Sequence, residues 1–285
     1  MPEIKPVHLR VHKRIIEITI GKLRAANIKI NKRNVSYFYG GEGDSLVVIH
    51  GGGGGVNAWI DNLELLAEHY TVYAPDLPGF GNSQSIDDRF SVQENVGFIE
   101  SFTGELGLDN FYLIGHSVGG GIAIQYALDY PEKIKRLVLI SSLFLGKEIA
   151  FWARYLSSPS ILRHLGVAGL VMFDALAWFI RQFSFSLALK PPFSRVQIGI
   201  GKSIMSLKGQ TTILLDELTR LVMPTLLVWG SKDSIVPTKH AYAAADVIPD
   251  CNLHVFQDCG HHVYNQKKQD FTRLVVSFLG KGADK

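Results

Sequence analysis

The sequence predicts an α/β protein in which helices cover both faces of a mostly parallel sheet. Seven short apolar runs alternate with longer segments of helical periodicity along the 285 residues. Several of these runs are continuously apolar and β-branched, which is typical of strands that are buried on both faces. The alternation of strands and helices favours parallel strands joined by helical crossovers.

Each element can be placed from this pattern. The expected strands are Val35–Tyr39, Leu46–His50, Thr71–Ala74, Phe111–Gly115, Leu137–Ser141, Thr225–Trp229 and Leu253–Phe256. The expected helices lie at 58–69, 91–106, 118–129, 238–248 and 266–279. Ser91 precedes Glu94 by three positions, which predicts a capping box at the start of the second helix.

The pattern divides the chain into three regions. Residues 1–34 form a basic N-terminal arm and the first strand region, and residues 35–144 with 219–285 form the α/β core. Residues 145–218 interrupt the strand pattern, and eight aromatic residues fall within 35 positions of this segment. We expect this segment to be an inserted lid that packs over the sheet.

Charge and cysteine usage argue against several classes of function. The first 35 residues carry nine Lys/Arg and two Asp/Glu, whereas the rest of the chain has a net charge of −4. We expect a solvated arm, with weak contact to an anionic membrane surface as the alternative. No basic stripe or groove-reading motif predicts nucleic-acid binding.

Cys251 and Cys259 are expected to be free thiols, because two cysteines do not make a disulfide framework in a chain of this size. No Cys or His spacing predicts a metal site, and no cofactor is expected. The sequence shows no apolar leader and no uncharged apolar run of transmembrane length. A cytoplasmic protein, monomeric or homodimeric, is therefore expected.

A G-x-S-x-G pattern at residues 115–119 lies between an expected strand and an expected helix. A tight turn in that setting lifts the Ser117 hydroxyl clear of the backbone, and the flanking glycines leave room for the turn. The helix N-terminus adds positive potential for a developing oxyanion. The pattern predicts Ser117 as a nucleophile, with a glycine-rich packing turn as the alternative.

A serine hydroxyl needs a general base, and His261 is the candidate, with His262 as the competing base. Both follow the last expected strand, at the end of the sheet where α/β proteins place their sites. Asp233 follows the strand Thr225–Trp229 and would hold the imidazole in one tautomer, although a turn aspartate is the alternative. The chain order serine, acid, histidine is one that serine hydrolases use.

Five consecutive glycines, residues 51–55, follow the strand Leu46–His50. Glycine lets backbone N–H groups approach a substrate oxygen closely. The N–H groups of Gly52 and Val118 are the predicted oxyanion-hole donors. A phosphate cradle is the alternative, but the Lys-Ser/Thr ending of a P-loop is missing.

Over residues 35–280 these features resemble the α/β-hydrolase superfamily. The resemblance rests on the serine turn, the His-Gly-Gly-Gly loop and the segments Asp76–Ser83, Trp229–Pro237 and Asp258–His261. It implies an eight-stranded, mostly parallel sheet, with a lid inserted before the strand that bears the acid.

Within the superfamily, the glycine loop followed by Trp59 is similar to the meta-cleavage-product hydrolases, which cut a carbon–carbon bond in vinylogous 1,5-diketones. This chain has His116 where those enzymes usually carry Asn, and His262 where they usually carry Trp. Arg181 and Arg195 are the candidates for the lid arginine that binds a substrate carboxylate in that family.

The sequence therefore predicts a serine hydrolase that cleaves a carboxylic ester with an apolar moiety through an acyl-enzyme. Carbon–carbon hydrolysis of 2-hydroxy-6-oxo-dienoates, a ketone substrate, is the second hypothesis. A hydrolase-like small-molecule receptor is the third, because fold does not fix function. The residues expected to bind substrate are Gly51, Gly53, Trp59, His116, Trp152, Trp178 and His262.

Overall fold

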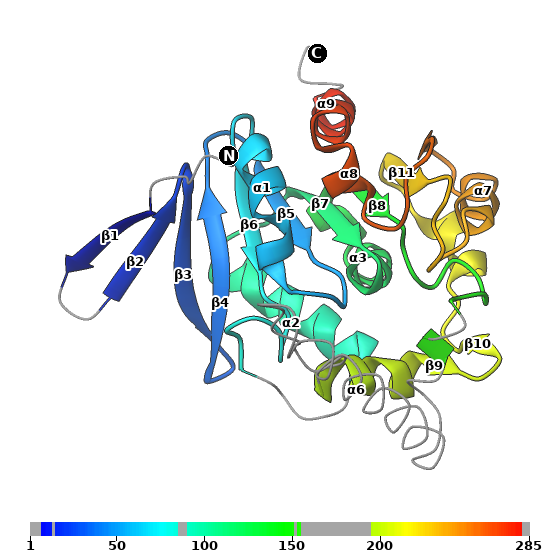
Figure 1. The fold of residues 1–285 in the computed structure, drawn as a ribbon, viewed down its shortest axis with the longest axis horizontal. Coiled ribbons are helices and arrows are strands. Elements are labelled where there is room, and N and C mark those ends of the chain that lie inside the picture. Colours follow the sequence, from blue (N-terminus) through cyan, green and yellow to red (C-terminus); the bar gives the residue numbers. More distant parts are fainter. Residues whose placement is uncertain (1–6, 13–14, 85–89, 151–152, 155–194, 281–285) are drawn as a thin grey trace, which may run out of the picture.

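The computed structural model describes residues 7–12, 15–84, 90–150, 153–154 and 195–280. Its centre is a ten-stranded sheet with the order β1-β2-β3-β4-β6-β5-β7-β8-β11-β12 (Figure 1). The antiparallel part consists of β1 (Val7–His12), β2 (Ile15–Ile20), β3 (Leu23–Ile30) and β4 (Arg33–Gly40). The parallel part consists of β5 (Ser45–Ile49), β6 (Thr71–Pro75), β7 (Phe111–His116), β8 (Ile134–Ile140), β11 (Thr225–Gly230) and β12 (Cys251–Phe256).

All seven expected strands are present, and the mostly parallel arrangement is confirmed. The resemblance implied eight strands, whereas the described residues contribute ten to this sheet. The difference comes from the basic arm, where β1, β2 and β3 replace the solvated extension that we expected. Leu23 and Ile30 at the two ends of β3 are buried, so this strand is anchored to the core. Contact of the arm with a membrane stays a prediction.

Helices cover both faces of the sheet, and each face has its own core. Alternate residues of one strand enter different cores: Val47 and Ile49 of β5 face one side, while Leu46 and Val48 face the other. The first core contains α2 (Val92–Glu105), α3 (Val118–Asp129) and α7 (Lys239–Ala245). The second contains α1 (Ile60–Leu66), α8 (Val263–Gln266) and α9 (Lys268–Leu279).

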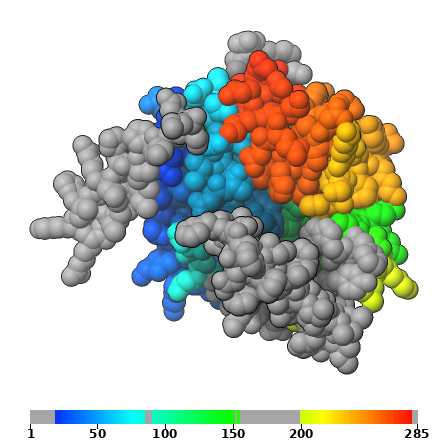
Figure 2. All heavy atoms as spheres, viewed as in Figure 1, coloured from blue at the N-terminus to red at the C-terminus, as the bar shows by residue number. Residues whose placement is uncertain are grey.

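The helix ends follow the local sequence. The Ser91 hydroxyl accepts a hydrogen bond from the Glu94 N–H at 3.3 Å, which is one of the two bonds of the predicted capping box. On the other face, α9 lies against α1, and Lys268 pairs with Asp61 across this contact. Figure 2 shows the C-terminal helices beside the α1 region on the surface of the molecule.

The sheet contains a topological switch point between β5 and β7. The chain leaves β5 towards β6 on one side and then returns to β7 on the other side of β5. Connections that run in opposite directions leave a crevice at the carboxyl ends of two such strands, where α/β proteins bind their ligands. The glycine loop follows β5 and Ser117 follows β7, so both emerge at this crevice.

The described part of the predicted lid lies between β8 and β11. It contains α6 (Arg195–Ile204), the two-stranded sheet of β9 (Met205–Ser206) and β10 (Gly209–Gln210), and a short 3-10 helix at Leu215–Arg220. Our expectation of no strands here was wrong for β9 and β10. The Gln210 side chain explains this hairpin, because it bonds to the backbone of Phe144 at 2.8 Å and of Gly146 at 2.7 Å. Within the described residues, no helix has the length and apolarity needed to cross a membrane.

Candidate active site

Ser117 lies in the turn between β7 and α3, with φ 55° and ψ −119°. This positive φ is unusual for a residue with a side chain, and the surrounding packing enforces it. A Cβ atom at Gly115 would lie 2.6 Å from the carbonyl oxygen of Gly119, and one at Gly119 would overlap the carbonyl oxygens of Ile49 and His50. Both glycines of the G-x-S-x-G pattern are therefore required by close backbone approach.

Asp233 and His261 form a buried pair in the loops after β11 and β12. The His261 Nδ1–H donates to the Asp233 carboxylate, at 2.9 Å from Oδ2 and 3.2 Å from Oδ1. Since a carboxylate only accepts, this contact fixes the proton on Nδ1 and leaves the lone pair on Nε2. A histidine in that tautomer is ready to accept a proton from a serine hydroxyl.

The Asp233 carboxylate is ionised in this setting. Burial alone would raise its pKa, but the hydrogen bond and charge interaction with His261 outweigh burial. The backbone N–H groups of Ile235 and Val236 also donate to Oδ1, each at 2.9 Å. The pKa of Asp233 is consequently lowered, so a fixed negative charge stands behind the imidazole.

The glycine loop is held close to the serine turn. A Cβ atom at Gly51 would lie 2.6 Å from His116 Nδ1 and 3.2 Å from Ser117 Cβ, so only glycine fits there. Gly52 and Val118 both line the pocket around Ser117, and a Cβ at Gly52 would lie 3.8 Å from the Val118 side chain. The N–H of Val118 is at the first position of α3, where helix geometry supplies no partner. The two residues predicted to supply the oxyanion donors thus lie side by side at the pocket.

Two buried polar side chains, Asp76 and His50, hold the glycine loop in place through hydrogen bonds to the backbone. The Asp76 carboxylate accepts from the N–H groups of Val56 and Asn82, at 2.9 and 3.2 Å. His50 donates from Nδ1 to the Gly51 carbonyl at 2.7 Å and accepts the Leu77 N–H on Nε2 at 2.9 Å. Both ring nitrogens of His50 are used in these bonds, so His50 is a structural histidine.

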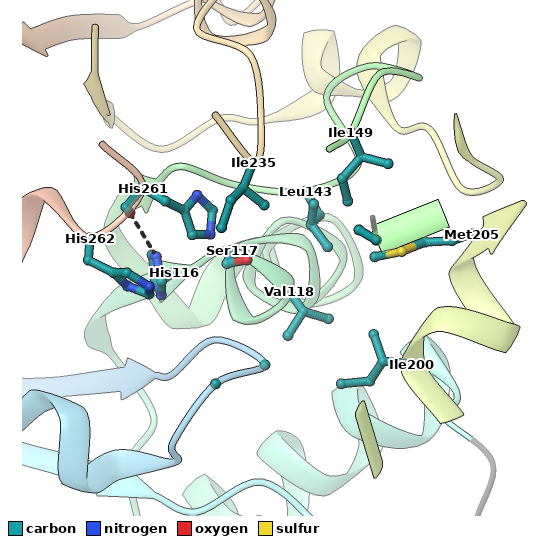
Figure 3. Close-up of a pocket in the computed structure, with 13 residues that line it drawn as sticks. His116, Ser117, Val118, Leu143, Ile149, Ile200, Met205, Ile235, His261 and His262 are labelled. Atoms are coloured by element: carbon teal, nitrogen blue, oxygen red, sulfur yellow. Dashed lines mark hydrogen bonds between the residues drawn. The ribbon is translucent and has the colours of Figure 1, made fainter. Parts of the chain in front are cut away.

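The pocket around Ser117 is a cavity of about 200 Å³ with three histidines at one end and apolar side chains at the other (Figure 3). Its described lining comprises Gly52, Gly53, His116, Ser117, Val118, Leu143, Ile149, Ala153, Ile200, Met205, Ile235, His261 and His262. The only titratable groups in this lining are the histidines. Burial lowers the pKa of His262, and the neighbouring charge of His261 lowers it further.

The predicted substrate residues divide into three groups. Gly53, His116 and His262 line the pocket, and Gly51 lies directly behind it. Trp59 is not among the described lining residues: it is 1% exposed and stacks on Tyr264 at a ring distance of 4.0 Å. Its large apolar surface is buried in the core beneath the loops that form the candidate site. Trp152, Trp178 and Arg181 lie outside the described residues, as does the side chain of Arg195.

Sequence reasoning missed the apolar residues that close the pocket. Ile200 and Met205 come from the described part of the lid, and Leu143, Ile149 and Ile235 come from the loops after β8 and β11. The amphipathic pattern of α6 was the one available signal, since Ile200 and Ile204 share its buried face. Within the described residues, no cluster of side chains could hold a metal ion, and both cysteines are free.

Comparison with known proteins agrees with this architecture. The sequence model described as alpha/beta hydrolase fold matches residues 44–166 and 173–268, and the chain belongs to this family. A 2-hydroxy-6-oxo-6-phenylhexa-2,4-dienoate hydrolase of Burkholderia cepacia is 27% identical over 286 residues, covering 93% of this chain and 96% of that protein.

Two further matches are informative. The meta-cleavage product hydrolase of Pseudomonas fluorescens IP01 superimposes with a TM-score of 0.69 at 25% identity, covering 90% of this chain and 97% of that one. The dihydrolipoyllysine-residue acetyltransferase component of the acetoin cleaving system of Cupriavidus necator is 30% identical over 253 residues, which are 85% of this chain. The match spans only 65% of that relative's length.

Proposed function

We propose that this hydrolase cleaves a carboxylic ester with an apolar acyl group through a Ser117 acyl-enzyme. The observation that carries the proposal is the juxtaposition of Ser117 and the Asp233–His261 pair in one pocket whose remaining side chains are mostly apolar. Buried apolar walls with a few directed polar groups are typical of sites for apolar small molecules.

The chemistry follows from the positions of the groups. Ser117 Oγ attacks the ester carbonyl while His261 Nε2 takes its proton, and Asp233 stabilises the imidazolium. The N–H groups of Gly52 and Val118 receive the oxyanion. His261 then returns the proton to the departing alcohol, and water attacks the acyl-enzyme with His261 again as base.

A series of nitrophenyl esters with increasing acyl length tests this proposal. We expect turnover of apolar acyl chains, and we expect Ser117→Ala to lower kcat by a factor on the order of 10⁴ to 10⁶, because triad members act as a unit. A fluorophosphonate probe should label wild-type protein at Ser117. Ester turnover by Ser117→Ala within tenfold of wild type would refute the assignment.

Hydrolysis of a carbon–carbon bond is the second candidate, and the dienoate hydrolase and the meta-cleavage product hydrolase named above favour it. Their substrates carry a carboxylate, whereas the described lining offers three histidines and no Lys or Arg. Burial lowers the pKa of His116 and of His262, which leaves both neutral at pH 7. The described lining therefore supplies no fixed positive charge for a carboxylate, and a dienoate substrate would depend on Arg181 or Arg195, whose side chains lie outside the described residues.

Assaying a ring-fission dienoate beside the nitrophenyl esters separates the two candidates. Efficient dienoate cleavage without ester turnover would overturn the ester proposal and leave the serine mechanism in place. Turnover of the esters without cleavage of the dienoate would support the ester proposal.

A further inference from the structure

His116 lies beside the nucleophile but has no place in the triad chemistry. Its side chain is 2% exposed, and its Nε2 lies 3.2 Å from the backbone carbonyl oxygen of His261 (Figure 3). A carbonyl oxygen only accepts, so Nε2 carries the proton and donates it to this bond. One histidine of the site therefore holds the backbone of another.

The hydrogen bond at Nε2 also defines the protonation of the other ring nitrogen of His116, Nδ1. With the proton on Nε2, Nδ1 is an unprotonated acceptor, and this buried atom has no hydrogen-bond partner among the described residues. It faces the Gly51 backbone, where a Cβ atom would lie only 2.6 Å away. His116 thus bonds to the backbone of the loop that carries His261, and the other edge of its ring contacts the glycine loop at residues 51–55.

Three catalytic segments meet at this ring. Ser117 is the next residue in the chain, Gly51 packs against the ring edge, and the rings of His116 and His261 lie 4.9 Å apart. Tyr264 supports the ring from another side, at 4.9 Å in an edge-to-face contact. Burial and the neighbouring histidines lower the pKa of His116 well below its ordinary value, so this ring is neutral at pH 7.

We propose that His116 is a positioning residue that holds the general base by donating its Nε2–H to the His261 carbonyl. The inference rests on the proposed hydrolase function, with His261 as base. Small displacements of a catalytic group cost rate steeply, because the reacting atoms must be aligned within a fraction of an ångström. Loss of this bond is expected to lower kcat about 10- to 100-fold and to leave KM within about threefold.

The two carboxamide residues distinguish this role from simple packing. The amide nitrogen of Gln reaches the place of a histidine Nε2, whereas that of Asn reaches only the place of Nδ1. His116→Gln should retain the donor and stay within about fivefold of wild-type kcat. His116→Asn and His116→Phe should both lose the bond, although Phe keeps the ring volume.

The readouts are kcat and KM on a nitrophenyl ester, the rate of fluorophosphonate labelling at Ser117, and Tm. His69→Gln and His69→Phe are matched controls, since His69 is exposed and far along the chain from the site. We expect the labelling rate of each variant to depend on whether residue 116 still donates a hydrogen bond to the His261 carbonyl, and not to correlate with Tm. The inference would be overturned if His116→Gln had a kcat and labelling rate no higher than those of His116→Phe. A labelling rate of His116→Phe within twofold of wild type would overturn it equally. Absence of labelling in wild-type protein would instead overturn the proposed function.

Discussion

Replacing Asp233 by Asn tests the orientation of the catalytic base with little change in shape. The Asp233 Oδ1 accepts two backbone N–H groups, from Ile235 and Val236, each at 2.9 Å. In the variant, only the amide oxygen can accept these two bonds, so it takes the place of Oδ1. The amide NH₂ is then forced towards His261 Nδ1.

This geometry predicts the wrong tautomer. An NH₂ group donates, so Nδ1 of His261 must become the acceptor and the ring proton must move to Nε2. A protonated Nε2 cannot take the Ser117 proton. We expect kcat to fall by about 10⁴-fold, equivalent to about 5.4 kcal/mol at about 1.36 kcal/mol per tenfold change.

The assay measures kcat on a nitrophenyl ester together with the free energy of unfolding. Both bonds from the backbone N–H groups survive in Asp233→Asn. The free energy of unfolding should therefore fall only by the contribution of the charged bond to His261, about 1–3 kcal/mol. Asp258→Asn is the matched control, because Asp258 is an exposed aspartate in the neighbouring loop after β12, and its ion pair with Lys232 is at the surface. Activity of Asp233→Asn within tenfold of wild type would refute the role given to this carboxylate.

Three further predictions concern packing, pH and specificity. Gly119→Ala should unfold or severely destabilise the chain because its Cβ overlaps the His50 carbonyl oxygen, whereas Gly97→Ala, in open space on α2, should raise the free energy of unfolding by up to about 1 kcal/mol in denaturant titrations. Burial lowers the pKa of His50 and His116 in the folded chain, so as the pH falls these histidines take up protons in the unfolded chain before they do so in the folded one. The stability they contribute is complete above about pH 6.5 and falls below it by up to about 1.4 kcal/mol per pH unit for each histidine; a Tm that stays constant from pH 7.5 to 5 would contradict this. Ile200→Ala should favour longer acyl chains by about fourfold in kcat/KM per added methylene, measured across the ester series, and Ile200→Phe should do the reverse.

The geometry of the candidate site was predictable because its signals are local. The strand before Ser117 and the glycines around it are adjacent in sequence, and the backbone contacts at Gly115 and Gly119 show why no other residue type fits. Asp233 and His261 were found from their places after predicted strands, and parallel sheets bring such places together.

Features that depend on tertiary packing were not predictable. Trp59 resembled a substrate residue, but whether an indole faces a pocket or stacks on Tyr264 depends on a helix more than 200 positions away. In the N-terminal arm, the charge of the Lys and Arg residues masked the strand periodicity of β1 to β3. The role of His116 depends on which carbonyl lies opposite its ring, and that carbonyl belongs to residue 261.

The backbone of Ser117 carries a consequence for the evolution and engineering of this protein. Its φ of 55° suits glycine far better than serine, and such conformations hold about 1–3 kcal/mol of strain. Ser117→Gly should therefore give a protein that is more stable and inactive. Selection for thermal tolerance alone would drive the chain towards this loss, so a screen for robust variants must also select for turnover.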